Sequence, residues 1–232
     1  MTKSLRAELL IVLTLTFGIS GVRAVLNLIN SLAAPQRLDE QSVTLNSSQS
    51  SLAWVDMGLQ LCSSAVLFSY GALALFLLAK DRFVPRAHRA RDWLEGAGLA
   101  ALIGIPGLAL YFAAVQLGWS KEGIPGDFAN AWVEIPVSLL KAAANAFAEE
   151  TVVVMWLMTR LRQARWSLPA TLAASSILRG SYHLYQGVSA GFGNIIMGLI
   201  YGYYYHRTGR VWPLVIAHFL IDAVAFVGYS FL

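Results

Sequence analysis

The sequence predicts an all-α integral membrane protein, a polytopic bundle of about seven transmembrane helices, from its composition and from the spacing of its apolar segments. Hydrophobic residues make up 57% of the 232 residues, charged residues make up 13%, and the mean hydropathy is +0.59. Soluble proteins average about 25% charged residues. Because the basic residues gather in short loops between apolar stretches, the net charge of +4 indicates membrane topology and not nucleic-acid binding.

Seven segments are candidates for spans, since a helix needs about 20 apolar residues to cross a bilayer. These segments are residues 9–32, 52–79, 93–118, 128–166, 168–187, 191–205 and 212–232. The fourth is too long for one span, and we expect a helix kinked near Pro136 and then an interfacial turn. If this segment divides into two spans, the total becomes eight. Residues 33–51 are polar and are expected to form a loop outside the membrane.

The first apolar segment has a second interpretation, a cleaved signal peptide, because Lys3 and Arg6 precede it and small residues follow at 31–34. Its length favours a span, since the apolar region of a signal peptide has about 7–15 residues. The lone Cys62 lies within an apolar run, so no intramolecular disulfide can form, and we expect a buried thiol.

The positive-inside rule predicts an integral protein of the plasma or cytoplasmic membrane with a cytoplasmic N-terminus. In that orientation most basic residues fall in cytoplasmic loops: Lys3, Arg6, Lys80, Arg82, Arg86, Arg89, Arg91, Arg160, Arg162, Arg165, Arg207 and Arg210. An eighth span would move the last two outside. The chain is expected to form a single transmembrane domain, with three variable N-terminal spans in residues 1–125 and the catalytic core in residues 126–232.

Ionisable residues interrupt the later apolar segments. They are Glu134, Lys141, Glu149, Glu150, Arg179, His183, His218 and Asp222. A charge at the bilayer centre costs about 2.5–3.5 kcal/mol on insertion scales, so such residues are rare unless they are paired or functional. Residues four apart share a helix face, which groups Arg179 with His183 and His218 with Asp222.

Packing offers a simpler explanation for each residue taken alone. A lone histidine can serve as a hydrogen-bonded packing residue, and Arg179 can form a charge pair with Glu149 or Glu150 that permits burial of both. Glu134 and Lys141 are assigned a pairing or interfacial role without chemistry. Taken together, however, these side chains on three spans would be a costly way to stabilise packing, which favours a functional site. A glutamate there can deprotonate water, while histidines hold a metal or stabilise an oxyanion.

At these residues the sequence resembles the CAAX-protease and bacteriocin-processing family of intramembrane proteases, whose motifs are Glu-Glu-x-x-x-Arg, Phe-x-x-x-His and His-x-x-x-Asn/Asp. The corresponding residues here are Glu149, Glu150 and Val154, then Arg179 and His183, then His218 and Asp222. The resemblance covers about residues 130–232. It implies hydrolysis of a peptide bond in a membrane-associated peptide or protein substrate.

The same resemblance implies the role of each residue. Glu149 would be the base or a metal ligand, with Glu150 as its partner. His183 and His218 would bind a metal or stabilise the oxyanion, and Asp222 would orient His218 or stabilise the intermediate. Zinc, held by His183, His218 and Glu149, is compatible with this residue set.

Two residues depart from the family pattern, because Val154 replaces its arginine and Arg179 replaces its phenylalanine. Our hypothesis is that these are one compensated change, in which Arg179 supplies the missing cation from another helix. Catalytic residues would then include Arg179.

Two other classes of function compete with the protease. A noncatalytic immunity or scaffold protein would keep the polar core for folding, and a proton-coupled transporter or channel subunit would use it as a relay. Repeated halves typical of carriers are not evident, which disfavours transport. The expected partners are membrane lipids and a membrane-associated substrate, with no nucleic acid.

Overall fold

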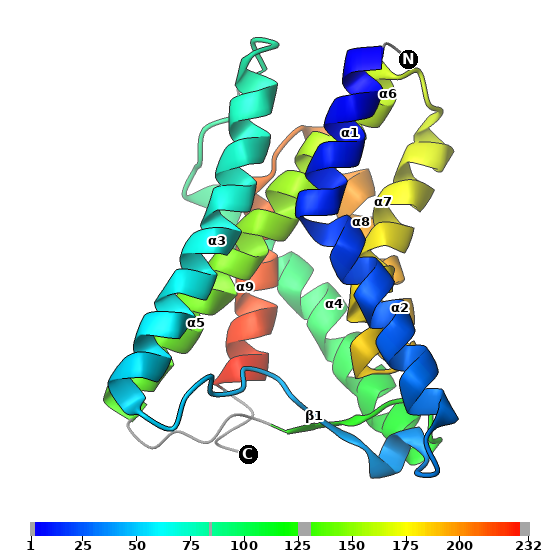
Figure 1. Ribbon diagram of the computed structural model, residues 1–232. Coiled ribbons are helices and arrows are strands. Elements are labelled where there is room, and N and C mark those ends of the chain that lie inside the picture. The colour runs from blue at the N-terminus through cyan, green and yellow to red at the C-terminus, as the bar shows by residue number, and fades with distance from the viewer. Residues whose placement is uncertain (1–2, 84, 125–130, 228–232) are drawn as a thin grey trace. The chain divides into compact units, whose positions relative to one another are not determined.

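The computed structural model describes residues 3–83, 85–124 and 131–227, and most of them lie in helices (Figure 1). Two three-residue strands, β1 (Ser42–Thr44) and β2 (Glu122–Ile124), pair with each other. Short 3-10 helices, η1 (Leu38–Glu40) and η3 (Leu184–Gln186), accompany the longer helices. The predicted all-α class is confirmed, and the chain forms two compact units.

The first unit contains the described residues of three stretches, Met1–Ser42, Ile105–Glu122 and Val152–Arg210. Its helices are α1 (Lys3–Leu15), α2 (Phe17–Ala33), the C-terminal part of α4 (Arg91–Gln116), α6 (Leu157–Gln163), α7 (Leu168–His183) and α8 (Val188–Thr208). α7 packs against both α2 and α8. A Cβ atom at Gly198 of α8 would lie 2.9 Å from Cα of Ser176 in α7. The absence of a side chain there lets the two backbones approach closely.

The second unit contains the described residues of Val43–Gly104, Gly123–Thr151 and Val211–Leu232. Its helices are α3 (Ala53–Ala79), the N-terminal part of α4, α5 (Ala131–Glu149) and α9 (Trp212–Phe226). α5 packs against both α3 and α9 (Figure 1). A Cβ atom at Gly71 of α3 would lie 2.8 Å from Oγ1 of Thr151 and overlap the ring of Phe147. Gly71 therefore lets α3 lie close to the chain that carries Glu149 and Glu150.

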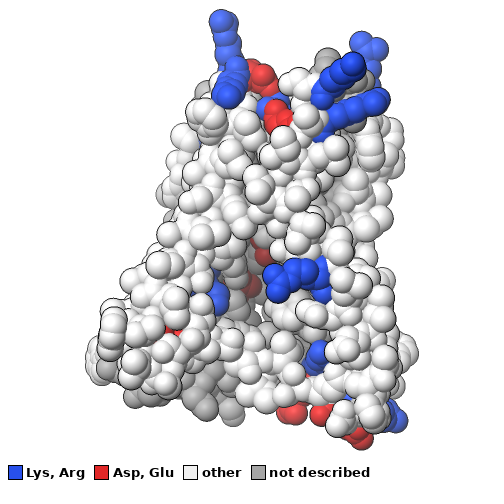
Figure 2. Space-filling model, in the orientation of Figure 1, with Lys and Arg blue, Asp and Glu red and all other residues white. Residues whose placement is uncertain are grey.

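Two described helices, α3 and α4, are each long and apolar enough to cross a membrane. The 27 residues of α3 extend about 40 Å, which exceeds the bilayer core of about 30 Å. The pair α1 and α2 would be a third span if it crosses as one bent element. Uncharged residues form most of the surface seen in Figure 2, as expected for a protein in lipid.

The remaining predicted spans are shorter or more polar. α7 has 16 residues and α9 has 15, while α5 carries Glu134, Lys141 and Glu149. The number of seven or eight spans therefore stays a prediction. Residues 128–130 and 228–232, which belong to the predicted fourth and seventh segments, lie outside the described residues.

Two features of the early segments differ from the sequence-based expectation. The segment at residues 9–32 is divided at Thr16 into α1 and α2, which are bent by 50°. Thr16 Oγ1 donates a hydrogen bond of 2.7 Å to the carbonyl of Val12, which is consistent with a helix break there. Cys62 is exposed on α3, so the prediction of a buried thiol was wrong. Lipid would accommodate a thiol as readily as a protein core does, because the thiol behaves as a small hydrophobic group.

The fourth segment changes helix type after Glu149. α5 includes Pro136 and ends at Glu149, and a π-helix, η2 (Glu150–Trp156), leads into α6. A π-helix disturbs the regular backbone ladder and is frequent at functional sites. Ser175 of α7 donates a 2.7 Å hydrogen bond from Oγ to the carbonyl of Val153, which satisfies one of the backbone acceptors in this stretch.

Glu8 of α1 forms a part-buried ion pair with Arg160 of α6 in the first unit. Glu8 Oε1 lies 2.6 Å from Arg160 Nε and accepts a hydrogen bond of 3.0 Å from Trp156 Nε1. The Arg160 side chain is 4% exposed and that of Glu8 is 23% exposed. We expect Glu8→Ala to lower the free energy of unfolding by about 2–3 kcal/mol, less than for a fully buried pair.

Thermal unfolding in detergent measures this loss. Glu95→Ala is the matched control, because Glu95 pairs with Arg91, whose side chain is 78% exposed. Removal of that exposed pair should cost less than about 1 kcal/mol. Equal losses in the two variants would contradict the proposed importance of the Glu8 pair.

Candidate active site

His218 lies between two carboxylates in the second unit. Its Nδ1 atom is 2.8 Å from Oε1 of Glu150, and its Nε2 atom is 3.5 Å from Oδ1 of Asp222. Glu150 is fully buried, and His218 is 3% exposed. A carboxylate beside each ring nitrogen fixes the orientation of the buried imidazole. When the imidazole is protonated, its positive charge offsets the negative charge of the carboxylates. This arrangement is the centre of the candidate site.

The local folding of α5, η2 and α9 positions these groups. Asp222 follows His218 by one helical turn, so the two lie on the same face of α9 as the sequence spacing predicts. Glu150 is the first residue of the π-helix, directly after the end of α5. Because α5 packs against α9, Glu150 reaches His218 from the neighbouring helix.

Asn145 extends this chain of polar contacts and was missed by the sequence reasoning. Its Nδ2 atom donates a hydrogen bond of 3.4 Å to Oδ2 of Asp222, which connects α5 to α9 a second time. The signal was present, since Asn145 precedes Glu149 by four residues and the two share a helix face. An uncharged amide in an apolar segment is a weaker signal than a charge.

Glu149 is close to the same imidazole. It is 7% exposed, and its carboxylate interacts electrostatically with His218. Three carboxylates, those of Glu149, Glu150 and Asp222, therefore act on one histidine within this unit. The sequence-based grouping of these four residues agrees with their placement here, while their chemical roles stay predictions.

Arg179 and His183 belong to α7 in the first unit. Arg179 is fully buried, with Nη1 3.9 Å from Sδ of Met197 and the guanidinium carbon 5.6 Å from the centre of the Tyr201 ring. Aromatic and thioether groups of this kind can stabilise a buried cation. Its predicted contact with Glu149 or Glu150 stays a prediction, as does the convergence of His183 with His218.

His183 has a defined hydrogen-bonding state on α7. Its Nδ1 atom lies 3.0 Å from the carbonyl oxygen of Arg179, one turn earlier. A carbonyl oxygen can only accept, so Nδ1 carries the proton and a neutral ring has its lone pair at Nε2. Such an imidazole is suited to accept a proton, to bind a metal or, when charged, to donate to an oxyanion.

The position of the family arginine is occupied by a buried apolar side chain. Val154 is 0% exposed and lies within the π-helix. An arginine there would bring a charge into a buried environment and would need a partner. Compensation by Arg179 stays a prediction.

The predicted zinc ligands do not all belong to one unit, because His183 lies in the first unit and Glu149 and His218 lie in the second. Among the three described stretches of chain, no group of three or more His, Cys, Asp or Glu is placed to hold a metal ion. Both ring nitrogens of His218 face carboxylate oxygens instead. Zinc at His183, His218 and Glu149 stays a prediction, and the chemistry below is derived from the side chains alone.

Lys141 is one turn before Asn145 on α5 and joins two other segments of the second unit. Its Nζ atom donates hydrogen bonds to Oδ1 of Asn46 at 2.8 Å and to Oε1 of Gln60 in α3 at 3.2 Å. Asn46 also donates to Ser138 of α5 at 2.8 Å. These contacts support the pairing role expected for Lys141 and hold the loop before α3 against α5.

One comparison with known proteins gives a match. Residues 131–224 match the family model described as type II CAAX prenyl endopeptidase Rce1-like. All six predicted site residues lie within this stretch. No curated protein and no solved structure matches the chain. The matched stretch begins with α5 and includes α9 up to Val224, and so covers the elements that carry the candidate site.

Proposed function

Because residues 131–224 match the type II CAAX prenyl endopeptidase Rce1-like family, we propose that this chain is an intramembrane endopeptidase of the CAAX-protease and bacteriocin-processing family, which hydrolyses a peptide bond in a membrane-associated substrate. One observation supports the assignment of the active site to residues within the matched stretch. His218 is held between the carboxylates of Glu150 and Asp222, with Glu149 beside it, in a buried part of the chain. Buried, mutually compensating ionisable groups of this kind are typical of catalytic sites.

Glu149 acts as the general base. Glu150 is hydrogen-bonded to His218 and so serves to orient the imidazole, which leaves the neighbouring carboxylate for water. Glu149 removes a proton from water as the oxygen attacks the peptide carbonyl carbon. The C–N bond then breaks, and the same proton passes to the departing amine. The new carboxyl group gives its proton to the amine as well, so the products are a carboxylate and an ammonium group, one water is consumed and Glu149 is again ionised.

His218 stabilises the developing oxyanion. Its contact with Asp222, at 3.5 Å, is long for a hydrogen bond, whereas the contact with Glu150 is 2.8 Å. A substrate oxygen can therefore replace Asp222 at Nε2 while Glu150 keeps the ring in place. Asp222, linked to Asn145, holds the imidazole in the absence of substrate. The donor is already oriented before the oxyanion forms, which is the condition for effective electrostatic stabilisation.

His183 and Arg179 are included in this proposal from the sequence motifs. His183 is a second oxyanion donor or, with Glu149 and His218, a ligand of zinc. Arg179 supplies the cation that the family places at the position of Val154. About seven spans, with a cytoplasmic N-terminus, complete the proposed topology. Apolar surface on the lipid side provides the approach for a substrate that is itself in the membrane.

The function is tested by comparing membrane proteomes from cells that produce the protein, cells that lack it, and cells that produce Glu149→Gln. We expect new peptide termini in membrane-associated proteins with the wild-type chain and their disappearance in the variant. A chelator added to isolated membranes tests the zinc proposal separately, since loss of cleavage that returns with zinc would support it. An identical set of termini in all three cultures would favour the noncatalytic scaffold.

Arg179 gives a test that is specific to this sequence. We expect Arg179→Phe to reduce cleavage by about 10²–10³-fold, because an electrostatic contribution to the site is removed. Addition of Val154→Arg to that variant restores the family pattern and should recover much of the activity. Cleavage and thermal unfolding are measured together for both variants. Unchanged cleavage in Arg179→Phe, with another membrane arginine proving essential, would refute the compensation hypothesis.

A further inference from the structure

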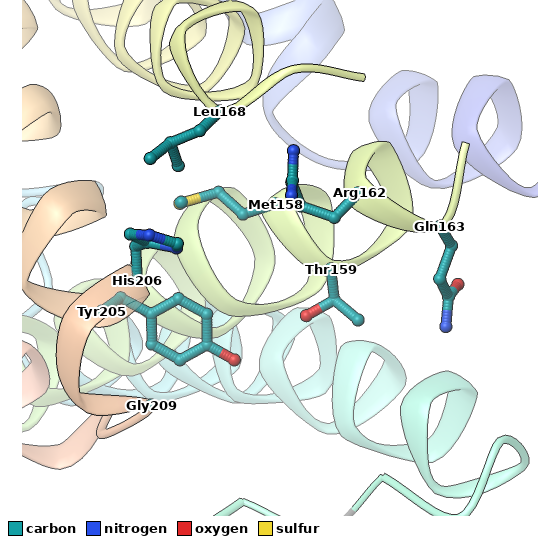
Figure 3. Close-up of a pocket in the computed structure, with 8 residues that line it drawn as sticks. All are labelled: Met158, Thr159, Arg162, Gln163, Leu168, Tyr205, His206 and Gly209. Atoms are coloured by element: carbon teal, nitrogen blue, oxygen red, sulfur yellow. The ribbon is translucent and has the colours of Figure 1, made fainter. Parts of the chain in front are cut away.

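An open cavity of about 450 Å³ lies in the first unit, and none of its lining residues belongs to the motifs assigned above (Figure 3). Met158 of α6 and Leu168 at the start of α7 form apolar walls, and Tyr205 of α8 is a buried part of the lining. Arg162 and His206 are exposed residues of the same lining. The cavity therefore combines apolar walls with cationic or hydrogen-bonding groups. Such a lining is suited to an amphiphilic ligand that has an anionic headgroup.

The helices that line this cavity belong to a stretch of sequence that carries positive charge and no acidic residue of its own. The sequence contains no Asp or Glu from Thr151 to Ile221, whereas Arg162, Arg165, Arg207 and Arg210 fall within that stretch. Among the described residues, Arg162 Nη1 donates to the carbonyl of Trp166 at 2.6 Å, and a guanidinium has five N–H donors. Several donors therefore remain for an anion, and arginine matches phosphate geometry well.

An exposed apolar strip on α8 ends at His206, a residue that lines the cavity. Ile196, Leu199 and Tyr203 are 40%, 42% and 53% exposed, and with His206 they follow helical spacing of three or four residues on one face. An acyl chain beside α8 would run along this strip and bring its headgroup to His206 and Arg162. Trp166, 43% exposed near the cavity, is a residue type enriched at the membrane interface.

We propose that this cavity binds the headgroup phosphate of an anionic phospholipid, with an acyl chain lying along the exposed strip of α8. Arg162 contacts the phosphate and His206 contacts the phosphate or its substituent. Basic pockets between membrane helices suit such headgroups, and its place in the lining distinguishes Arg162 from the other arginines of this stretch. This site does not depend on the proposed proteolytic function.

The probe is short-chain phosphatidylglycerol, titrated into the purified full-length chain in detergent while the unfolding temperature is recorded. Phosphatidylcholine of the same chain length is the control for the acyl chains, and inorganic phosphate at the same concentration is the control for the anion. We expect a saturable rise in the unfolding temperature with phosphatidylglycerol and a much smaller one with either control. Arg162→Gln should weaken the apparent affinity about fivefold.

Arg165→Gln is the matched variant, because it removes the same charge three residues later from a side chain that does not line the cavity. Its affinity for phosphatidylglycerol should stay close to that of the wild type. If Arg162→Gln does not fold, His206→Gln, at an exposed position, takes its place. Equal shifts with phosphatidylcholine, an equal shift with inorganic phosphate alone, or equal losses in Arg162→Gln and Arg165→Gln would each overturn the proposal.

Discussion

Glu149→Gln is expected to reduce peptide hydrolysis by about 10²–10⁴-fold, the contribution usually made by a general base. Glutamine has nearly the same shape as glutamate but cannot take the proton from water. Because Glu150 and Asp222 still face His218 in this variant, the hydrogen bonds that orient the imidazole are retained. The fold should therefore survive. Initial rates on a substrate identified from the membrane comparison, in reconstituted vesicles, measure the loss.

Glu134→Gln is the matched control for this experiment, because it removes one carboxylate from the same helix, about four turns before Glu149. We expect the cleavage rate of Glu134→Gln to stay within about twofold of that of the wild type, since Glu134 is assigned no chemical role. Loss of a general base typically lowers kcat far more than this. Comparable losses in both variants, or full activity in Glu149→Gln, would count against Glu149 as the base.

His218→Asn is expected to lower activity by about 10²–10³-fold through loss of the proposed oxyanion donor. Asparagine is shorter than histidine, so its amide can approach Glu150 but does not reach the position of Nε2 near Asp222. This change leaves a buried carboxylate with fewer hydrogen bonds, and the unfolding free energy should fall by about 1–3 kcal/mol. Cleavage rate and unfolding temperature are therefore both expected to decrease.

His88→Asn provides the comparison, because His88 is an exposed residue outside the site and packs only edge-on against Trp93 and Trp212 among its described ring contacts. It should change neither quantity appreciably. Comparison of the cleavage rate with the unfolding temperature distinguishes a protease from a noncatalytic scaffold. A scaffold would lose stability in His218→Asn without any Glu149-dependent product, whereas a protease loses turnover at temperatures where the variant is still folded.

The sequence was informative about the class of fold because a long apolar helix leaves a strong pattern. α3 and α4 correspond closely to the predicted segments, since each is uninterrupted by charge over most of its length. The span count was harder to predict. α7 and α9 are short, and α5 carries charged side chains, so length and hydropathy alone do not identify these helices as spans.

The part of the site on α9 was also predictable, because His218 and Asp222 are separated by one turn of a regular helix. Glu150 was harder to place, since it begins a π-helix and the regular spacing of an α-helix no longer applies after it. Asn145 was missed because a neutral amide in an apolar segment stands out less in the sequence than a charged side chain, whose transfer into the membrane costs more free energy. The pairing of α5 with α9 depends on contacts far apart in the sequence, which local patterns do not encode.

The Glu8–Arg160 pair has a consequence for the biosynthesis of the protein. The two residues are separated by 152 positions, so at about 5–20 residues per second the carboxylate of Glu8 is made roughly 8–30 s before its guanidinium partner. During that interval α1 lacks the contact that later fixes it to α6. α1 is therefore made early but forms its contact with α6 late. In a nascent chain halted before Arg160, α1 should be accessible to protease or to a labelling reagent.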